Sequence, residues 1–297
     1  MGTENRDIPV EMVVRCFGLI PLWLRKALFI GLWRIFYHFS PKQRFTAVHN
    51  LLRAFPDKSM AEIVGIAKGA YRNLAIVCAE FFDLPRMNRE RLDRLLDIEG
   101  LERTRQALEK KNGLLLVGAH FGNWELMAVA SSSFLAPMNA VYRPLDNPFL
   151  DRVVRYVRSS TGNIPIPKRR AMLQMIRALS RGGIVGVLID QNVSWKEGIF
   201  VEFFGRPACT TDGVAQMVLR GETPVMPAFM VRQHDGRYRL VIGDEIDIIR
   251  TGDWDADVKA NTQQFTRIIE DMIRQYPDQW LWLHNRWKTK VHQMRRK

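Results

Sequence analysis

The stretch GLLLVGAHFGNWELMAVASSS, at residues 113–133, runs from a compact apolar segment through a His-containing turn into a helical pattern. The apolar segment over 113–118 has the length and composition of a buried strand, and residues 124–133 repeat apolar side chains at helical spacing. Further along the chain, short apolar runs keep alternating with helical patterns. This alternation predicts an α/β fold, with a mixed, mostly parallel sheet flanked by helices.

Around this stretch the sequence divides into three parts. We expect an N-terminal membrane-associated helix over 1–40, a helical region over 41–99 and an α/β domain over 100–297, with one compact unit from 41 onward. Helices are expected over 10–38, 42–54 and 59–83, the last starting at a Ser59–Glu62 capping box, and two short ones between 88 and 110. In the α/β domain, further strands are expected at 138–143, 163–167, 183–190, 199–205, 223–231 and 237–243, and helices at 147–160, 169–180, 211–220 and 257–275.

The charge balance predicts an anionic partner. Lys and Arg number 44 against 31 Asp and Glu, which gives a formal net charge of +13. An excess of this size is typical of proteins that bind nucleic acid, an anionic membrane surface or an acidic protein. The three cysteines, Cys16, Cys78 and Cys209, have no C-x-x-C spacing, which argues against a disulfide framework and a cysteine-ligated zinc site.

The segment VVRCFGLIPLWLRKALFIGLWRIFYHF, at 13–39, is apolar and aromatic on every side. Four cations interrupt it: Arg15, Arg25, Lys26 and Arg34. Its longest charge-free runs, 16–24 and 27–33, fall short of the ~20 apolar residues that a membrane span needs. We therefore expect a helix that lies in the membrane rather than one that crosses it; the alternative is a buried helix of a large core.

His120 and Glu125 are the strongest candidates for chemistry. His120 lies in the turn after the predicted strand, at the carboxyl end, where α/β folds place their ligands. Histidine suits general-base work near neutral pH, and a carboxylate on its far ring nitrogen would fix the tautomer and stabilise the imidazolium. Gly122 in the turn would let Glu125 bend back toward the ring. The alternative is a structural histidine followed by a glutamate that the helix dipole favours.

Polar side chains follow several other expected strands. Arg143, held by the proline that follows it, is expected on the same face as His120, where its guanidinium would bind phosphate. Asp190 would pair with Arg143 and orient it, and Arg206 is a second candidate for phosphate binding. The structural alternatives are a solvated arginine in a turn and a capping aspartate.

Seven blocks, in order from about residue 18 to residue 288, carry a family resemblance: ALFIGLW, NLLRAFP, HFGNWE, VYRPLDNP, LIDQN, FFGRP and HNRWK. Together they resemble the bacterial lipid A biosynthesis acyltransferases, the lauroyl and myristoyl transferases, within the superfamily that carries an H-x-x-x-x-D/E motif. The resemblance implies a glycerolipid acyltransferase-like fold and an acyl carrier protein as the acyl donor. It also implies no metal or other cofactor, and a site on the cytoplasmic face of the inner membrane.

The resemblance assigns roles by position. His120 and Glu125 become the catalytic pair. Arg143, Asp190, Gln191, Arg206 and Asn123 become substrate-binding residues. The implied reaction moves a fatty acyl chain directly, without an acyl-enzyme, to a hydroxyl of a lipid A precursor or another anionic lipid. The basic cluster Lys168-Arg169-Arg170 would meet the acidic carrier protein.

Two alternatives stay open. Residues 121–124 of the motif are common to the broad family, so an acyltransferase acting on a lysophospholipid or a phosphoglycolipid also fits. A nucleic-acid-binding protein would explain the charge but not the apolar N-terminus, and the sequence has no RNP, helix-turn-helix or zinc pattern. We therefore expect carrier protein, lipid and membrane as partners, and no nucleic acid.

Overall fold

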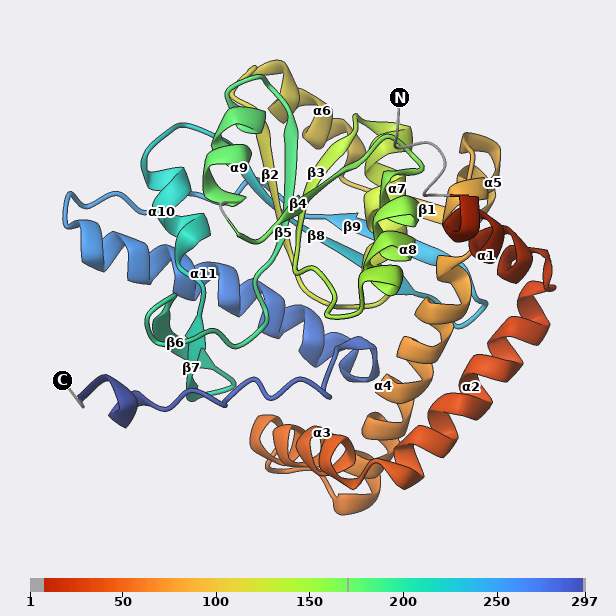
Figure 1. Ribbon diagram of the computed structural model, residues 1–297. Coiled ribbons are helices and arrows are strands. Elements are labelled where there is room, and N and C mark those ends of the chain that lie inside the picture. Colours follow the sequence, from red (N-terminus) through yellow and green to blue (C-terminus); the bar gives the residue numbers. More distant parts are fainter. Residues whose placement is uncertain (1–7, 170, 296–297) are drawn as a thin grey trace.

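The computed structural model describes residues 8–169 and 171–295, which form a central β-sheet with helices on both faces (Figure 1). The strands of the sheet are β1 (Leu96–Glu99), β2 (Leu114–Gly118), β3 (Met138–Tyr142), β4 (Ile164–Pro167), β5 (Ile184–Leu188), β8 (Val225–Arg232) and β9 (Tyr238–Ile242). They lie in the order β1-β9-β8-β2-β5-β3-β4. Neighbouring strands are parallel except β8 and β9, which are antiparallel. The mixed, mostly parallel sheet is confirmed.

Strand β2 lies in the middle of the sheet, between β5 and β8. Its side chains point to the two faces in turn: Leu115 and Val117 enter one hydrophobic core, and Leu114 and Leu116 enter the other. A parallel strand buried on both faces requires a continuous apolar run, and LLLVG supplies it. The turn that follows β2 therefore starts at the centre of the sheet's carboxyl edge.

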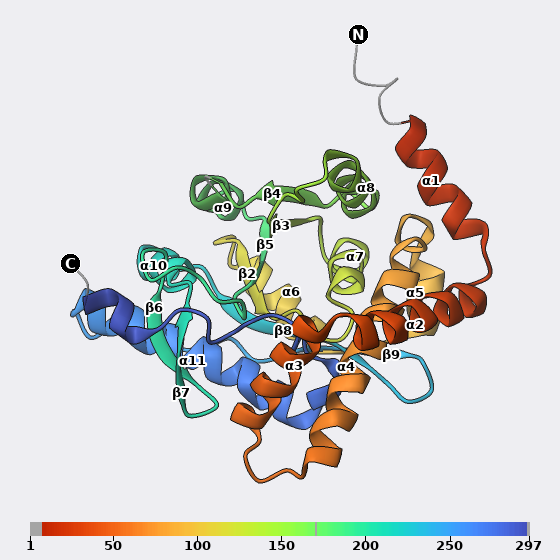
Figure 2. The same cartoon turned by 60° about the horizontal axis from the view of Figure 1, so that its bottom comes forward.

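Two sets of helices cover the two faces. On one face lie α5 (Arg89–Leu95), α6 (Leu101–Glu109), α7 (Trp124–Phe134) and α8 (Pro148–Ser159); on the other lie α9 (Ala171–Leu179), α10 (Gly213–Leu219) and α11 (Trp254–Gln275). Figure 2 shows α7 and α11 on opposite sides of β8. The two cores thus lie on either side of the sheet, as the alternation of strands and helices in the sequence predicts.

Four further helices precede the sheet: α1 (Ile8–Leu19), α2 (Leu22–Phe39), α3 (Pro41–Ala54) and α4 (Met60–Phe81). The single helix expected over 10–38 is wrong at Pro21, which stands at the N-cap of α2 and separates it from α1. Proline lacks the backbone N–H that a continuous helix would need there. The capping box at the start of α4 is confirmed, because the Ser59 N–H donates to Glu62 at 2.9 Å and the Glu62 N–H donates to the Ser59 hydroxyl at 3.3 Å.

Two cations of α2 are paired inside the protein. The buried Arg25 guanidinium donates to the Ala79 carbonyl at 2.9 Å and to the Asp83 carboxylate at 2.5 Å. Lys26 pairs with Glu80 at 2.8 Å. These contacts fix α2 along α4, so one side of the N-terminal segment is packed protein. Across the described part of the chain, no helix combines the length and the apolar character that crossing a bilayer requires.

Two short strands differ from the sequence prediction. Only helices were expected in the region of α5 and α6. The structure has the strand β1 between them, and its pairing with β9, which is distant in sequence, holds these residues in an extended conformation. Strand β7 (Arg206–Thr210) follows β6 (Ile199–Phe203) through Phe204 and Gly205, both at positive φ as in a tight hairpin turn. Thr210 is the last residue of β7, and Asp212 holds the N-cap of α10 without a side-chain hydrogen bond.

Candidate active site

The turn after β2 holds the candidate base. Gly122 adopts φ +56°, and a Cβ there would lie 1.6 Å from the Met230 carbonyl oxygen, so only glycine fits. The Asn123 side chain then caps α7 by accepting the Leu126 N–H at 3.1 Å. This sharp turn leaves the His120 ring partly exposed at the carboxyl edge of the sheet.

The imidazole of His120 is bonded to Asp190, which follows β5. The two side chains meet at 2.8 Å between Nδ1 and Oδ1, and the His120 backbone N–H donates to Asp190 Oδ2 at 3.0 Å. Burial alone would raise the pKa of the Asp190 carboxyl, but the His120 ring and the hydrogen bonds it receives hold that pKa below its usual value. An ionised Asp190 accepts a hydrogen bond from Nδ1–H, which leaves Nε2 free to accept a proton.

Glu125 lies in the first turn of α7 and is bonded to Arg158 of α8. The Arg158 fork donates from Nε at 2.9 Å and from its terminal nitrogen at 2.5 Å, and the Trp124 indole donates at 3.0 Å. Burial would raise the pKa of the Glu125 carboxyl, but the Arg158 guanidinium outweighs it and holds the pKa low. The hydrogen bond expected between Glu125 and His120 is wrong in this structure, because Glu125 points across to α8 while the ring faces Asp190.

Arg158 is a site residue that sequence reasoning missed. Its guanidinium is largely buried, lies 5.7 Å from the Tyr142 ring centroid, and forms a two-pronged pair with Glu125. The sequence of α8 also holds Arg152 and Arg155. Nothing in the spacing of the three arginines shows that Arg158 is the one that turns toward the protein interior. Arg158 is identified as a site residue by the packing of α8 against α7, and no sequence motif marks it.

The other expected site residues are scattered. Arg143 is 79% exposed and pairs with Asp146 at 3.4 Å, so its expected pairing with Asp190 is wrong; that carboxylate is already bonded to His120. Arg206 is exposed in the hairpin and donates to the Arg53 carbonyl on α3 at 3.4 Å.

Gln191 and Asn123 do lie beside the motif. The Gln191 amide nitrogen is 3.5 Å from His120 Nε2. Asn123 is buried, and its amide donates to Glu80 at 2.8 Å while its oxygen caps α7. Its contacts are those of a structural residue that shapes the turn.

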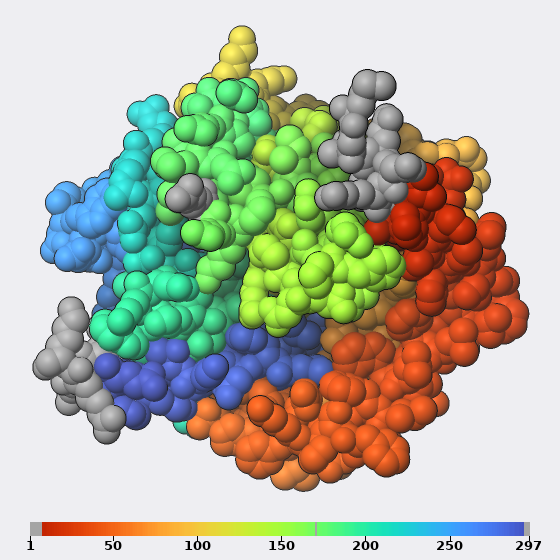
Figure 3. Space-filling view, in the orientation of Figure 1, coloured from red at the N-terminus to blue at the C-terminus, as the bar shows by residue number. Residues whose placement is uncertain are grey.

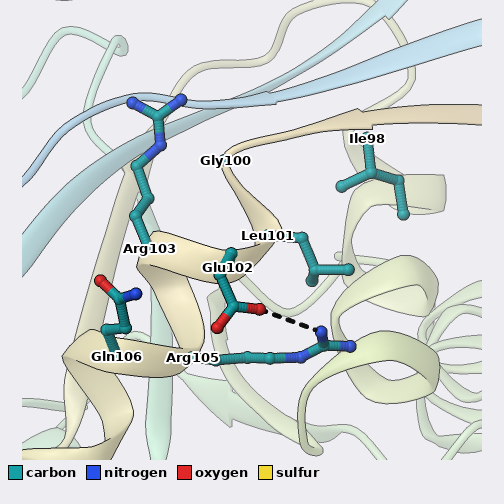
Figure 4. A pocket seen from close by; sticks show the side chains of 7 residues that line it. All are labelled: Ile98, Gly100, Leu101, Glu102, Arg103, Arg105 and Gln106. Carbon is teal, nitrogen blue, oxygen red and sulfur yellow. Dashed lines mark hydrogen bonds and ion pairs between the residues drawn. The ribbon is translucent and has the colours of Figure 1, made fainter.

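Two features lie outside this site. An open hollow of about 570 Å³ at the start of α6 is lined by Ile98, Gly100 to Arg103, Arg105 and Gln106, and it shares no residue with the His120 site (Figure 4). Lys168 of the basic cluster pairs with Glu197 at 2.9 Å, and Arg170 lies outside the described residues.

Within 8–169 and 171–295, no three His, Cys, Asp or Glu side chains gather as a metal site would require.

Comparison with known proteins finds a family match over most of the chain. The family model of the bacterial lipid A biosynthesis acyltransferases matches residues 9–289. The chain is 28% identical over 268 residues to the lipid A biosynthesis lauroyltransferase of Escherichia coli K12, covering 88% of this chain and 84% of that protein. It is 28% identical to the palmitoleoyltransferase of the same organism, with 92% and 90% covered. A phosphatidylinositol mannoside acyltransferase of Mycolicibacterium smegmatis is 23% identical, with 80% and 81% covered.

Proposed function

Because the chain belongs to the bacterial lipid A biosynthesis acyltransferase family, and is therefore an enzyme that transfers acyl groups, we propose that it acylates a hydroxyl of a lipid A precursor. The proposed donor is a fatty acyl thioester of acyl carrier protein. The observation that carries the proposal is the 2.8 Å contact between His120 and Asp190. It leaves Nε2 at the open edge of the sheet, ready to take a proton from a hydroxyl.

In the proposed reaction, His120 is the general base. Nε2 removes the proton of the acceptor hydroxyl as its oxygen attacks the thioester carbonyl, and Asp190 stabilises the imidazolium that forms. The tetrahedral intermediate then breaks its carbon–sulfur bond, and the departing thiolate takes the proton back from Nε2. The products are an ester on the lipid and the free thiol of the carrier, with no oxidant or reductant involved.

Glu125 and Arg158 complete the proposed site. Glu125 contributes a second negative charge near the imidazolium, and it holds the Arg158 fork in one orientation. A guanidinium fixed in this way suits a phosphate group of the acceptor or the developing oxyanion. The catalytic pair in this proposal is therefore His120 and Glu125, with Asp190 as the direct partner of the ring.

The cysteines favour direct transfer over a covalent acyl-enzyme. Burial raises the pKa of the Cys78 thiol to about 11, and burial also raises that of Cys209. Thiols of this kind hold little thiolate near neutral pH. Cys16 is exposed on α1, and the sequence contains no G-x-S-x-G nucleophile elbow.

We further propose that α1, α2 and α3 lie on the cytoplasmic face of the inner membrane. These helices form the red-to-orange border of the molecule in Figure 3. They expose large apolar side chains to an unusual degree, among them Trp23 at 72%, Phe39 at 82% and Phe45 at 70%. An apolar surface of this kind, carried by helices that also bear cations, is typical of segments that lie in the membrane interface.

The proposed function is tested by product analysis. Purified enzyme, an acyl carrier protein thioester and a lipid A precursor should yield a lipid heavier by one acyl group, with one carrier thiol released per product. The His120→Ala variant is the control and should form both products at least about 10²-fold more slowly. A phosphatidylinositol mannoside or a lysophospholipid that is acylated while the lipid A precursor is not would move the enzyme to the alternative acceptor class.

A further inference from the structure

The indole of Trp280 faces the carboxylate that holds the base. Trp280 Nε1 donates a hydrogen bond to Asp190 Oδ2 at 2.8 Å, and its side chain is only 2% exposed. Asp190 Oδ2 also accepts the His120 backbone N–H, while Oδ1 faces the His120 ring. Trp280 is thus the only donor to this carboxylate, among the described residues, that comes from outside the His120 residue itself.

The backbone delivers Trp280 to this place. Phe121 and Trp280 form an antiparallel bridge. On either side of it, the Gly122 N–H donates to the Gln279 carbonyl at 2.9 Å, and the Leu281 N–H donates to the His120 carbonyl at 3.2 Å. The chain after α11 therefore runs beside the His-containing turn. These main-chain bonds do not depend on the identity of the side chain at 280.

The indole is also fixed by its neighbours. Its ring packs edge-on against Phe203 and Trp282, with centroid distances of 5.5 Å and 4.6 Å. A buried aromatic ring held on two sides has little rotational freedom, so the N–H keeps its aim at the carboxylate. The donor is therefore in place before any substrate binds.

We propose that Trp280 is a positioning residue, which holds the Asp190 carboxylate in line with the His120 ring and limits how strongly that carboxylate retains the ring proton. The inference rests on the proposed function for its meaning in catalysis. A hydrogen-bond donor spreads the carboxylate charge and weakens its pull on the imidazolium. Loss of the indole N–H should therefore leave more negative charge on Asp190 and make the charged His120 ring more stable.

The other charged groups around this pair do not mask the effect. Glu125 lies close enough to His120 for their charges to interact but is paired with Arg158, and Arg286 is a buried cation whose charge interacts with that of Asp190. Burial lowers the pKa of His284 to about 4, and its Nε2 accepts the Asn192 N–H at 2.9 Å. Between about pH 5 and 8, where a histidine ordinarily titrates, Glu125 stays negative, Arg286 stays positive and His284 stays neutral.

The chain supplies a matched control in Trp282. This second tryptophan is 0% exposed and also donates from its indole, but to the Pro277 carbonyl at 2.6 Å. Trp280→Phe and Trp282→Phe therefore remove the same atoms from neighbouring buried rings. Only the first change takes a donor away from Asp190.

The experiment compares the two variants in the full-length enzyme. For Trp280→Phe we expect turnover to fall about tenfold, as for a lost bond to a charged group. The acid limb of its pH–rate profile should move to higher pH by about half a unit or more. The titration of the His120 ring, followed by NMR with nitrogen-labelled histidine, should move in the same direction. Trp282→Phe should leave the midpoint of the acid limb and the midpoint of the His120 titration unchanged.

Equal midpoints in the two variants, or an unmoved midpoint in Trp280→Phe, would overturn the inference. If Trp280→Phe does not fold, the contact is tested instead by the NMR signals of the indole N–H groups in the wild-type protein and in Asp190→Asn. The Trp280 signal should shift in Asp190→Asn and the Trp282 signal should not; an unmoved Trp280 signal refutes the contact. A wild-type enzyme that transfers no acyl group would refute the proposed function, while the NMR titration would still report on the contact.

Discussion

At the scale of residues, the site depends on which carboxylate meets the histidine. The sequence places Glu125 five positions after His120, and that nearness made it the expected partner of the ring. The partner in the structure lies 70 residues away, at Asp190. The two meet because β2 and β5 pair in parallel with Gly118 opposite Leu188, so their carboxyl ends coincide. A spacing motif carries no information about that register, although the polar residue after an apolar strand did mark Asp190 as a candidate.

We predict that Asp190→Asn lowers kcat by on the order of 10³–10⁴-fold, with a much smaller change in KM. An asparagine amide in place of the carboxylate would donate to Nδ1, so the proton would move to Nε2 and the base would be lost. Steady-state kinetics measure the rate, and nitrogen NMR of the ring reports the tautomer. The control is Asp146→Asn, an exposed carboxylate that should have no effect. A variant at 190 with wild-type turnover and an unchanged tautomer would return the orienting role to Glu125.

At the scale of elements, periodicity identified most helices and strands, and it failed where the cause was a partner or a single residue. The N-terminal periodicity hid the break at Pro21. The edge strand β1 has four residues and gains its order from β9. Helix α2 also shows why four cations within an apolar segment were hard to interpret: Arg25 and Lys26 pair with α4, while the opposite side of the helix remains apolar and exposed.

The exposed side of α2 and α3 leads to a prediction about membrane binding. Replacing Trp23, Phe39 and Phe45 together by Ser should lower the bound fraction on anionic phospholipid vesicles several-fold without unfolding the protein, because each side chain is at least 70% exposed. Vesicle sedimentation measures the bound fraction. This substitution tests the exposed surface more specifically than removal of residues 1–39 does, because the removal would also expose the α4 surface that α2 buries.

The control for that measurement replaces Leu145 and Leu150 by Ser. Both are exposed leucines, but they precede or belong to α8 rather than to the N-terminal helices. Their loss should leave vesicle binding unchanged. Equal effects of the two sets, or full binding by the triple variant, would contradict a membrane surface made by α2 and α3.

At the scale of the whole molecule, the sequence predicts the layers of the α/β fold. It does not predict that the segment after α11 returns to the centre of the sheet. The alternating pattern from 113 onward predicts the sheet, and seven blocks indicate the family. The last block, HNRWK, gave no indication of where its segment would fold. In the structure, Trp280, Trp282 and Arg286 are buried, and the main chain at 279–281 runs beside the His-containing turn. That placement comes from tertiary hydrogen bonds between the last segment and residues near 120, which no local pattern encodes.

The central claim is direct acyl transfer with His120 as the base, and one measurement tests it most directly. Turnover of wild-type enzyme and of folded His120→Ala is compared with an acyl carrier protein thioester and the lipid acceptor, while intact-protein mass spectrometry follows the enzyme. We predict a loss of about 10²–10⁴-fold in kcat for the variant and no acyl group on the enzyme at any stage. Transfer near the wild-type rate by His120→Ala, or an acylated enzyme that passes its acyl group to the lipid, would contradict the account.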